Sequence, residues 1–270
     1  MTTNKPQLHW SGIEMLSRCG EQYQRRYVEK EIIPPGVAII VGSATHHSIK
    51  ANLHAKLETG LLLPIEQIKD TARDSLVMAW NAGGVVLNEE EMAEGAAKVK
   101  AAAIDKAVRL STLHASEVAP RLCCTHVERP WVIELTGYPV DLAGQIDQQE
   151  PETIRDSKTS GKSPSATVAD ESDQLTIYAM AVRVLDGIMP SRVALDYLID
   201  NKTPVAKTFE STRTEEDFTP LLNRVEEAVK AMEKGVFVPA SASHWICNPK
   251  FCGYWSSCRY TRRKQISIAA

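Results

Sequence analysis

The sequence contains no apolar run long enough to cross a membrane. A membrane-spanning helix needs about 20 consecutive apolar residues, and no stretch of this chain approaches that length. Residues 1–5 also lack the apolar core of a signal peptide. We therefore expect a cytoplasmic protein that has no membrane partner.

A nucleotide-binding P-loop and a strong net charge are absent as well. Gly161-Lys162-Ser163 has the ending of the P-loop pattern G-x4-GK-[ST], but the first glycine of that pattern would fall on Asp156. The net charge is only −3, which gives no general attraction to nucleic acid. We expect no use of ATP, and any nucleic-acid binding has to come from local patches.

The composition that remains is ordinary for a globular protein. The chain has 270 residues, of which 43% are hydrophobic and 24% charged, and it contains no internal repeat or low-complexity segment. A chain of this size and composition can bury a substantial core. We expect one elaborated domain over residues 1–270.

The cysteines fall into two groups. Cys123 and Cys124 are adjacent at a predicted strand start, where their side chains would point apart, and we interpret them as structural thiols. In a reducing compartment the other four are more typical of metal or cluster ligands than of disulfides, with buried thiols as the alternative. Zn²⁺ also binds four thiolates, so the spacing leaves the metal open. These four are Cys19, Cys247, Cys252 and Cys258.

The spacing of apolar residues predicts helices in the first half of the chain. Ser11 and Glu14 have the spacing of a capping box, which predicts a helix over residues 11–28. Helical spacing begins again at Ala44 and continues, with breaks at glycine and proline, to about residue 117. The spacing therefore predicts a helical region made of several segments.

In the second half of the chain the spacing of apolar residues is no longer helical throughout, and short segments rich in β-forming residues alternate with turns and helices. This alternation predicts an α/β fold in which the strands belong to one sheet. Strands are predicted at residues 125–135, 138–147, 153–158, 193–199 and 206–209, and helices at residues 172–185 and 215–234.

Charged residues gather where two predicted strands end. Side chains alternate along a strand, so Asp156 and Lys158 project to one face while Ser157 points away and leaves its carbonyl free as an oxygen ligand. Asp147 ends the preceding strand and could meet Asp156 across the sheet. Two carboxylates of this kind hold Mg²⁺ or Mn²⁺, and His46 could supply a third ligand. The implied reaction is phosphodiester hydrolysis, in which Lys158 positions a water or stabilises the developing negative charge.

Each of these residues also has a plain structural interpretation. Asp147 alone is typical of a turn, and Asp156 with Lys158 is typical of an ion pair on a strand. His47 and His54 lie close to His46 on the same predicted helix, so they are alternative candidates for the histidine ligand.

Gln174 and Tyr178 are a second candidate pair. They are four residues apart on a predicted helix, so both lie on one face, where an amide and a phenol can hydrogen-bond to a phosphate or a nucleotide. That spacing is common in ordinary helices, and only the acids that precede it favour a functional interpretation.

Taken together and in order, these residues resemble the PD-(D/E)XK nuclease superfamily in its RecB-like branch. The resemblance covers about residues 8–259. It implies a restriction-endonuclease-like core with a central mixed β-sheet flanked by helices, in which residues 50–120 are a helical insertion. The matching motifs are Gly42-Ser43-Ala44-Thr45-His46 as GxxxH, Gly144-Gln145-Ile146-Asp147 as GxxD, Asp156-Ser157-Lys158 as D/E-x-K, and Gln174-Leu175-Thr176-Ile177-Tyr178 as QxxxY.

The resemblance implies a role for each motif residue. His46, Asp147 and Asp156 would bind Mg²⁺ or Mn²⁺ with the Ser157 carbonyl, and Lys158 would be catalytic together with the two acids. Gln174 and Tyr178 would contact the substrate.

The split cysteines resemble those of the iron–sulfur nucleases in this branch, which include CRISPR-associated, AddB-type and phage exonucleases. The resemblance implies that Cys19 and the last three cysteines hold a [4Fe–4S] cluster, with residues 240–262 as the C-terminal part of that site and Zn²⁺ as the lesser alternative. The last three have the spacing C-x4-C-x5-C. This first gap is longer than in the CRISPR group and favours a phage or mobile-element type.

The resulting hypothesis is a metal-dependent DNA exonuclease that acts at single-stranded ends in DNA recombination, repair, phage replication or CRISPR adaptation. It would work in a bacterial or phage-infected host cell, with recombination or adaptation proteins as possible partners. One alternative is a non-catalytic DNA-binding or assembly subunit on a nuclease fold. Another is a zinc-stabilised protein that cuts RNA or another phosphodiester.

Basic residues flank the first and last of the four cysteines. A shared cluster would bring them together as a collar for the DNA backbone, although a solvated surface explains them equally well. They are Arg18, Arg25, Arg26, Arg259, Arg262, Arg263 and Lys264.

Overall fold

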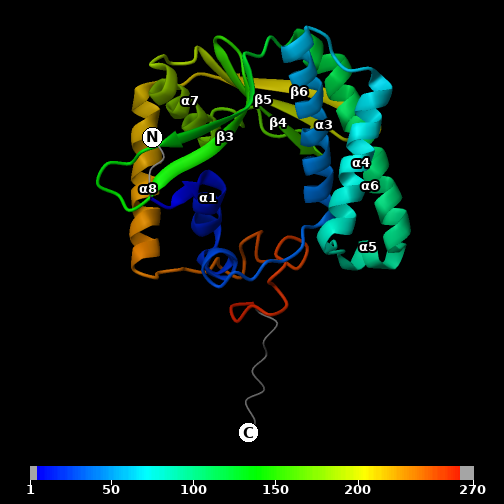
Figure 1. Ribbon diagram of the computed structural model, residues 1–270. Helices are drawn as coiled ribbons and strands as arrows, with labels where there is room; N and C mark the ends of the chain where they lie inside the picture. The colour runs from blue at the N-terminus through cyan, green and yellow to red at the C-terminus, as the bar shows by residue number, and fades with distance from the viewer. Residues whose placement is uncertain (1–4, 262–270) are drawn as a thin grey trace.

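The computed structural model describes residues 5–261 of the chain. Its centre is a six-stranded sheet with both parallel and antiparallel pairs, which confirms the predicted central mixed sheet (Figure 1). The strand order is β1-β3-β4-β5-β6, and β2 also pairs with β3. The strands are β1 (Gln7–His9), β2 (His126–Ile133), β3 (Asp141–Gln149), β4 (Thr153–Ser160), β5 (Arg192–Ile199) and β6 (Val205–Ser211).

The helices form two groups around the sheet. Figure 1 shows α3, α4 and α6 together on one side of the molecule, and α1, α7 and α8 on the other. No helix in the described part of the chain is long and apolar enough to span a membrane. The helices are α1 (Trp10–Arg18), α2 (Gly20–Tyr23), α3 (Val37–Thr59), α4 (Ile65–Gly83), α5 (Glu89–Glu94), α6 (Ala96–Leu113), α7 (Asp173–Asp186) and α8 (Phe218–Glu233), with the π-helical turns η1 (Gln24–Val28) and η2 (His114–Val118) and the 3₁₀ turns η3 (Ala119–Arg121) and η4 (Glu215–Asp217).

Two apolar clusters hold these helices on the sheet. In the first, residues of α1, α7 and α8 such as Leu175 pack on Leu142 and Ile154 of the strands. In the second, α3, α4 and α6 pack against one another and on Leu198 of β5. β5 also buries Leu195 in the first cluster, so both faces of this strand are covered and its sequence is almost continuously apolar. Each fully buried leucine or isoleucine contributes roughly 1.5–3 kcal/mol to folding.

The helix predicted over residues 11–28 is interrupted at Cys19. That residue is extended (φ −163°, ψ 104°) and separates α1 from α2. The next residue, Gly20, donates its backbone N–H to the Val238 carbonyl at 2.7 Å. A Cβ at Gly20 would lie 2.4 Å from the carbonyl carbon of Phe237. The break therefore lets the start of the chain contact its C-terminal segment directly, which helical spacing cannot reveal.

The capping box predicted at Ser11 is also wrong. α1 begins at Trp10 with His9 as its N-cap, because the short strand β1, which was not predicted, runs directly into the helix. Ser11 therefore lies inside the helix. Capping boxes form elsewhere, at Asn88 with Glu91 and at Thr214 with Asp217.

Two other boundaries differ from the prediction in ways that affect the site. α3 begins at Val37 and not at Ala44, so the motif that ends at His46 lies within a helix. β3 ends at Gln149, two residues later than predicted, so Asp147 lies just inside the strand. The remaining predicted strands and helices are observed within a few residues of their expected bounds.

Candidate functional site

The sheet opens into a fork beside β3. β2 pairs with residues 142–146 and with Gln148 and Gln149 of β3. β1, at residues 141–143, and β4, at Gln148 and Gln149, therefore share the opposite edge. Between these two short pairings, residues 144–147 have no strand partner on that edge within the described chain. β4 leaves β3 after Arg155 and then pairs with β5 alone. Asp147 and Asp156 therefore flank the point where the two strands separate.

One hydrogen-bond network joins β4 to α7 at the fork. The Lys158 ammonium lies 2.8 Å from Asp156 Oδ2 and donates to Gln174 Oε1 at 2.7 Å. The Gln174 amide donates to Asp156 Oδ1 at 3.1 Å and to the Tyr178 hydroxyl at 2.8 Å. As predicted, Asp156 and Lys158 share a face of β4, and Gln174 and Tyr178 share a face of α7. The hydrogen bonds show that these two faces contact each other. Ser157 points away, and its hydroxyl accepts from the Gln148 amide at 2.9 Å.

His46 approaches the fork from α3. Its Nδ1 lies 3.3 Å from Asp147 Oδ2, and neither side chain is more than one-third exposed. Burial alone would lower the pKa of His46, but the hydrogen bond and charge of Asp147 outweigh it and raise the pKa above its ordinary value. His47, the next residue on the helix, is exposed. We call His46, Asp147, Asp156, Lys158, Gln174 and Tyr178 the carboxylate site.

Burial dominates the electrostatics of the carboxylate site. Asp156 is 1% exposed, and burial raises its pKa to about 7, an effect that Lys158 opposes and Asp147 reinforces. Burial would lower the pKa of Lys158, but the Asp156 charge more than compensates and raises it. Burial and the two acids also raise the pKa of Tyr178. The site therefore contains a protonated lysine and a neutral phenol at neutral pH.

The donor chemistry of the carboxylate site suits a divalent ion, but the ligands do not converge in this arrangement. Within residues 5–261, no group of three or more His, Cys, Asp or Glu side chains is placed to hold a metal ion. His46 and Asp147 face each other, whereas Asp156 faces Lys158. Asp156 Oδ2 is buried and lies near the Lys158 charge without hydrogen-bond geometry. That oxygen is a hard donor without a hydrogen bond, the kind that Mg²⁺ or Mn²⁺ uses.

The four split cysteines meet at one small cavity, and we call them the thiol site: Cys19, Cys247, Cys252 and Cys258. The cavity has a volume of about 20 Å³, enough for one water molecule. Burial raises the pKa of Cys252, while hydrogen bonds from Gln22 and Tyr254 act in the opposite direction. The donor set is that of a four-thiolate centre, but the described cysteines are not placed to hold a metal in this arrangement. Cys123 and Cys124 do not line it.

Contacts between the two ends of the chain hold the thiol site together. The Ala240 N–H donates to Cys19 Sγ at 3.3 Å, and the Tyr254 hydroxyl donates to the Glu31 carbonyl at 2.6 Å. The Arg25 guanidinium binds the Glu31 carboxylate at 2.7 Å and stacks on the Tyr254 ring. Arg25 therefore serves this junction and is not a free charge of the expected basic collar.

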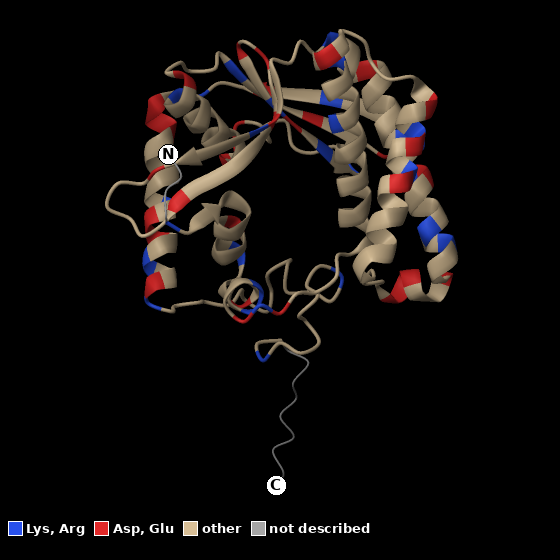
Figure 2. Ribbon diagram, in the orientation of Figure 1, with Lys and Arg blue, Asp and Glu red and all other residues tan. Residues whose placement is uncertain are grey.

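Two other basic residues of that collar also contact neighbouring side chains, and three lie beyond the residues that the structure describes. Arg259 lies 3.8 Å from Glu21, and Arg18 donates to Gln22. Arg262, Arg263 and Lys264 lie outside the described residues. Figure 2 shows acidic and basic residues interspersed along α4, α6 and α8, in keeping with the small net charge.

An ion pair that was not predicted from the sequence lies at the edge of the carboxylate site. Lys50 of α3 lies 3.2 Å from the Glu128 carboxylate of β2. Lys50 is four residues after His46, so the two share a face of α3, and this spacing was the available signal. For Glu128 the sequence offers no comparable signal.

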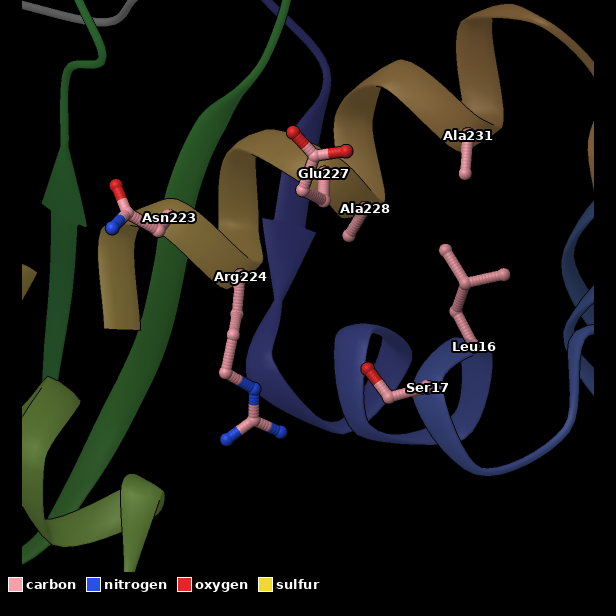
Figure 3. Close-up of a pocket in the computed structure, with 7 residues that line it drawn as sticks. All are labelled: Leu16, Ser17, Asn223, Arg224, Glu227, Ala228 and Ala231. Carbon is pink, nitrogen blue, oxygen red and sulfur yellow. The ribbon is translucent and has the colours of Figure 1, made fainter. Parts of the chain in front are cut away.

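A separate hollow lies between α1 and α8. Figure 3 shows side chains of both helices around it, among them Leu16, Ser17 and Ala228. Its volume is about 380 Å³. Arg224, at its edge, pairs with Asp173 and lies over the Trp10 ring. No residue of the carboxylate site or the thiol site lines this hollow.

Comparison with known proteins adds a family and a fold. The sequence profile of the PD-(D/E)XK nuclease superfamily matches residues 8–259. A provisionally named exonuclease from Eubacterium rectale, known from its crystal structure, matches 98% of this chain and 92% of its own with a TM-score of 0.55. At 16% identity this likeness shows the fold alone. No curated protein matches the sequence.

Proposed function

The chain belongs to the PD-(D/E)XK nuclease superfamily, and we propose that it is a metal-dependent deoxyribonuclease, an exonuclease that hydrolyses phosphodiester bonds at single-stranded DNA ends. The observation that carries the proposal is the fork between β3 and β4, where Asp147, Asp156 and Lys158 lie around one opening in the sheet. Nucleases of this superfamily generally use divalent metals.

Asp147 and Asp156 would hold Mg²⁺ or Mn²⁺ with their carboxylate oxygens, together with the His46 ring and the Ser157 carbonyl. The bound ion would polarise the phosphodiester and lower the pKa of a water. In this arrangement Asp156 Oδ2 is paired with the Lys158 ammonium at 2.8 Å, so binding of the ion would have to compete with this ion pair.

The remaining residues of the carboxylate site would act on the substrate directly. Lys158 keeps its proton beside Asp156, so it would act as a cation that stabilises negative charge on the phosphate. Gln174 and Tyr178 supply neutral donors next to it, and we assign them to the binding of phosphate or nucleotide.

We assign the thiol site to a structural [4Fe–4S] cluster held by the four cysteines, with Zn²⁺ as the alternative. This assignment places the protein in the iron–sulfur group of the RecB-like branch. It is supported by the four cysteines that line one cavity and come from the two ends of the chain. The cluster would fasten the segment at residues 240–262 to Cys19 and take no part in hydrolysis.

A DNA substrate follows from the nuclease family, and the name of the Eubacterium rectale protein supports an exonuclease. We place the activity in DNA recombination, repair, phage replication or CRISPR adaptation in a bacterial or phage-infected cell. Recombination or adaptation proteins are the corresponding partners, and no ATP is required.

The test is degradation of single-stranded DNA by anaerobically purified protein with Mn²⁺ or Mg²⁺. Linear DNA labelled at either end and circular DNA are compared for the wild type, Lys158→Ala and Lys162→Ala. Lys162 is an exposed lysine of the loop after β4 and serves as the matched control. Removal of Lys158 should lower kcat about 100- to 1000-fold, the usual effect of losing one group that stabilises transition-state charge.

The expected result is metal-dependent loss of linear but not circular DNA, which Lys162→Ala retains and Lys158→Ala does not. Cleavage that survives Lys158→Ala would contradict the assigned site. DNA binding without cleavage by the intact, cluster-loaded protein would favour a non-catalytic DNA-binding or assembly subunit instead.

A further inference from the structure

Glu128 has an unusual backbone conformation inside β2. Its φ is +55°, in the left-handed region that residues with a side chain rarely adopt. Lys30, the other described non-glycine residue with positive φ, lies in a connecting loop, whereas Glu128 is the third residue of an eight-residue strand. Such a conformation persists only where surrounding contacts hold it.

The left-handed residue removes Asp147 from the sheet ladder. The pairs on either side, Val127 with Gln148 and Arg129 with Ile146, are formed, but Glu128 and Asp147 are not paired. The other edge of β3 is open at the same place because of the fork. Asp147 therefore has no ladder partner on either edge of its strand in the described chain.

Two contacts hold Glu128 in this conformation. Its carbonyl accepts a hydrogen bond from the Gln145 side chain at 2.8 Å, so this backbone group has a partner although Glu128 has no ladder partner. Its carboxylate binds Lys50 of α3 at 3.2 Å. Lys50 and His46 lie on one face of α3, so the helix meets the two strands at two neighbouring points. His46 contacts Asp147, and Lys50 contacts Glu128.

We infer that Glu128 and Lys50 are positioning residues of the carboxylate site: their ion pair fixes α3 against β2 so that His46 faces Asp147, and the left-handed turn at Glu128 directs Asp147 into the fork. The inference rests on the proposed function, because it concerns residues that would hold the metal. Neither Glu128 nor Lys50 needs to touch the metal or the DNA. Their removal should weaken metal binding more than it weakens the fold.

The experiment separates the ion pair from the backbone conformation. Lys50→Met removes the pair alone. Glu128→Asn removes the carboxylate that binds Lys50 but keeps a residue that tolerates the left-handed region. Glu128→Val removes the carboxylate and also disfavours that backbone conformation. Lys50→Arg preserves the charge. The matched control is Asp200→Asn, which removes the charge of a carboxylate directly after β5 that pairs with Arg109 at 2.6 Å and Lys106 at 3.3 Å on α6.

Mn²⁺ affinity is measured by electron paramagnetic resonance without DNA, beside the thermal midpoint and kcat at saturating Mn²⁺. Lys50→Met and Glu128→Asn should weaken Mn²⁺ binding about tenfold to a hundredfold, the usual effect of removing a group that orients metal ligands. Glu128→Val should weaken it at least as much, and Lys50→Arg should stay close to the wild type. Asp200→Asn should change the thermal midpoint by a similar amount and leave Mn²⁺ affinity unchanged.

The inference is overturned if Lys50→Met and Glu128→Asn bind Mn²⁺ as tightly as Asp200→Asn while the wild type binds the ion and cuts DNA. In that case the proposed function stands and the pair is only structural. A wild type that neither binds Mn²⁺ nor cuts DNA overturns both. Should Glu128→Val not fold, Lys50→Met and Glu128→Asn still decide the question.

Discussion

The carboxylate site and the thiol site differ in how the fold assembles them. The first lies in a fork of one sheet, and its side chains already bind one another. The second joins Cys19 to three cysteines from the other end of the chain around a cavity with room for one water. The carboxylate site is therefore held by the sheet and by contacts among its own side chains, whereas the thiol site depends on contacts between distant segments of the chain.

The stability of each site should therefore depend on different parts of the chain. The carboxylate site rests on β3, β4 and two helices that belong to the main apolar clusters. The thiol site rests on a few contacts between the ends, such as the bond from Gly20 to Val238 and that from Tyr254 to Glu31. Damage to the thiol site should separate the ends and leave the fork in place.

Cys252→Ala tests this separation with the largest expected effect. Loss of one thiolate should release a long loop and lower the free energy of unfolding by about 3 kcal/mol, or the thermal midpoint by roughly 6–12 °C for a chain of this size. Yield and activity should fall as well. Mn²⁺ binding per folded molecule, measured well below the midpoint, should be retained. Cys123→Ala, at an exposed cysteine outside the thiol site, is the control.

The comparison breaks down in either of two ways. A stable and fully active Cys252→Ala protein would show that the thiol site does not fasten the ends. Loss of Mn²⁺ binding in the folded variant would show that the carboxylate site depends on the thiol site.

Gly20→Ala disturbs the same contact between the two ends of the chain without changing a cysteine. The new Cβ would lie 2.4 Å from the backbone carbonyl carbon of Phe237, which cannot move as a side chain can. We expect a loss of about 1–3 kcal/mol in the free energy of unfolding, as for other overpacked sites. Gly12→Ala is the control, because the nearest atoms to its new Cβ lie 3.7 Å away. Equal urea midpoints for the two variants would contradict the close packing at Gly20.

The prediction for His114 concerns the helix that packs beside the carboxylate site and depends on pH. Both ring nitrogens are buried without a hydrogen-bond partner among the described residues. Burial, with a smaller contribution from His46, lowers its pKa to about 3. The unfolded chain takes up a proton below its ordinary pKa of about 6.5, but the folded chain does not. Stability should therefore fall by about 1.4 kcal/mol for each pH unit below 6.5 until the folded pKa is reached.

The measurement is urea unfolding at pH 7 and pH 5. His114→Leu should lose about 2 kcal/mol less than the wild type between these two values. His126→Gln, at an exposed histidine, should behave as the wild type does. If His114→Leu keeps the acid sensitivity of the wild type, His114 is not its source.

The spacing of residues within a single strand or helix predicts those parts of the site that lie on one secondary-structure element. Alternation along a strand places Asp156 and Lys158 on one face, and the four-residue spacing on a helix does the same for Gln174 and Tyr178. The structure confirms both arrangements. The family pattern selected His46 among three nearby histidines, and it is the one that contacts Asp147.

The rest depends on contacts between distant segments, which no local period records. The fork exists because β4 separates from β3 after Arg155. The sequence of either strand alone does not predict where this pairing ends. The break at Cys19 follows from the backbone at Val238, and the left-handed Glu128 follows from Lys50 and Gln145. Extended and helical propensities at these positions were overruled by tertiary contacts.

The most direct test of the account is Mn²⁺ binding to the protein without DNA, in the wild type and in Asp156→Asn. Electron paramagnetic resonance reports the free ion, and Asp200→Asn controls for a neutral substitution elsewhere. The account predicts that the wild type and Asp200→Asn bind the ion, and that Asp156→Asn binds it at least about tenfold more weakly. Equal affinity in all three proteins would contradict the assignment of the fork as a metal site.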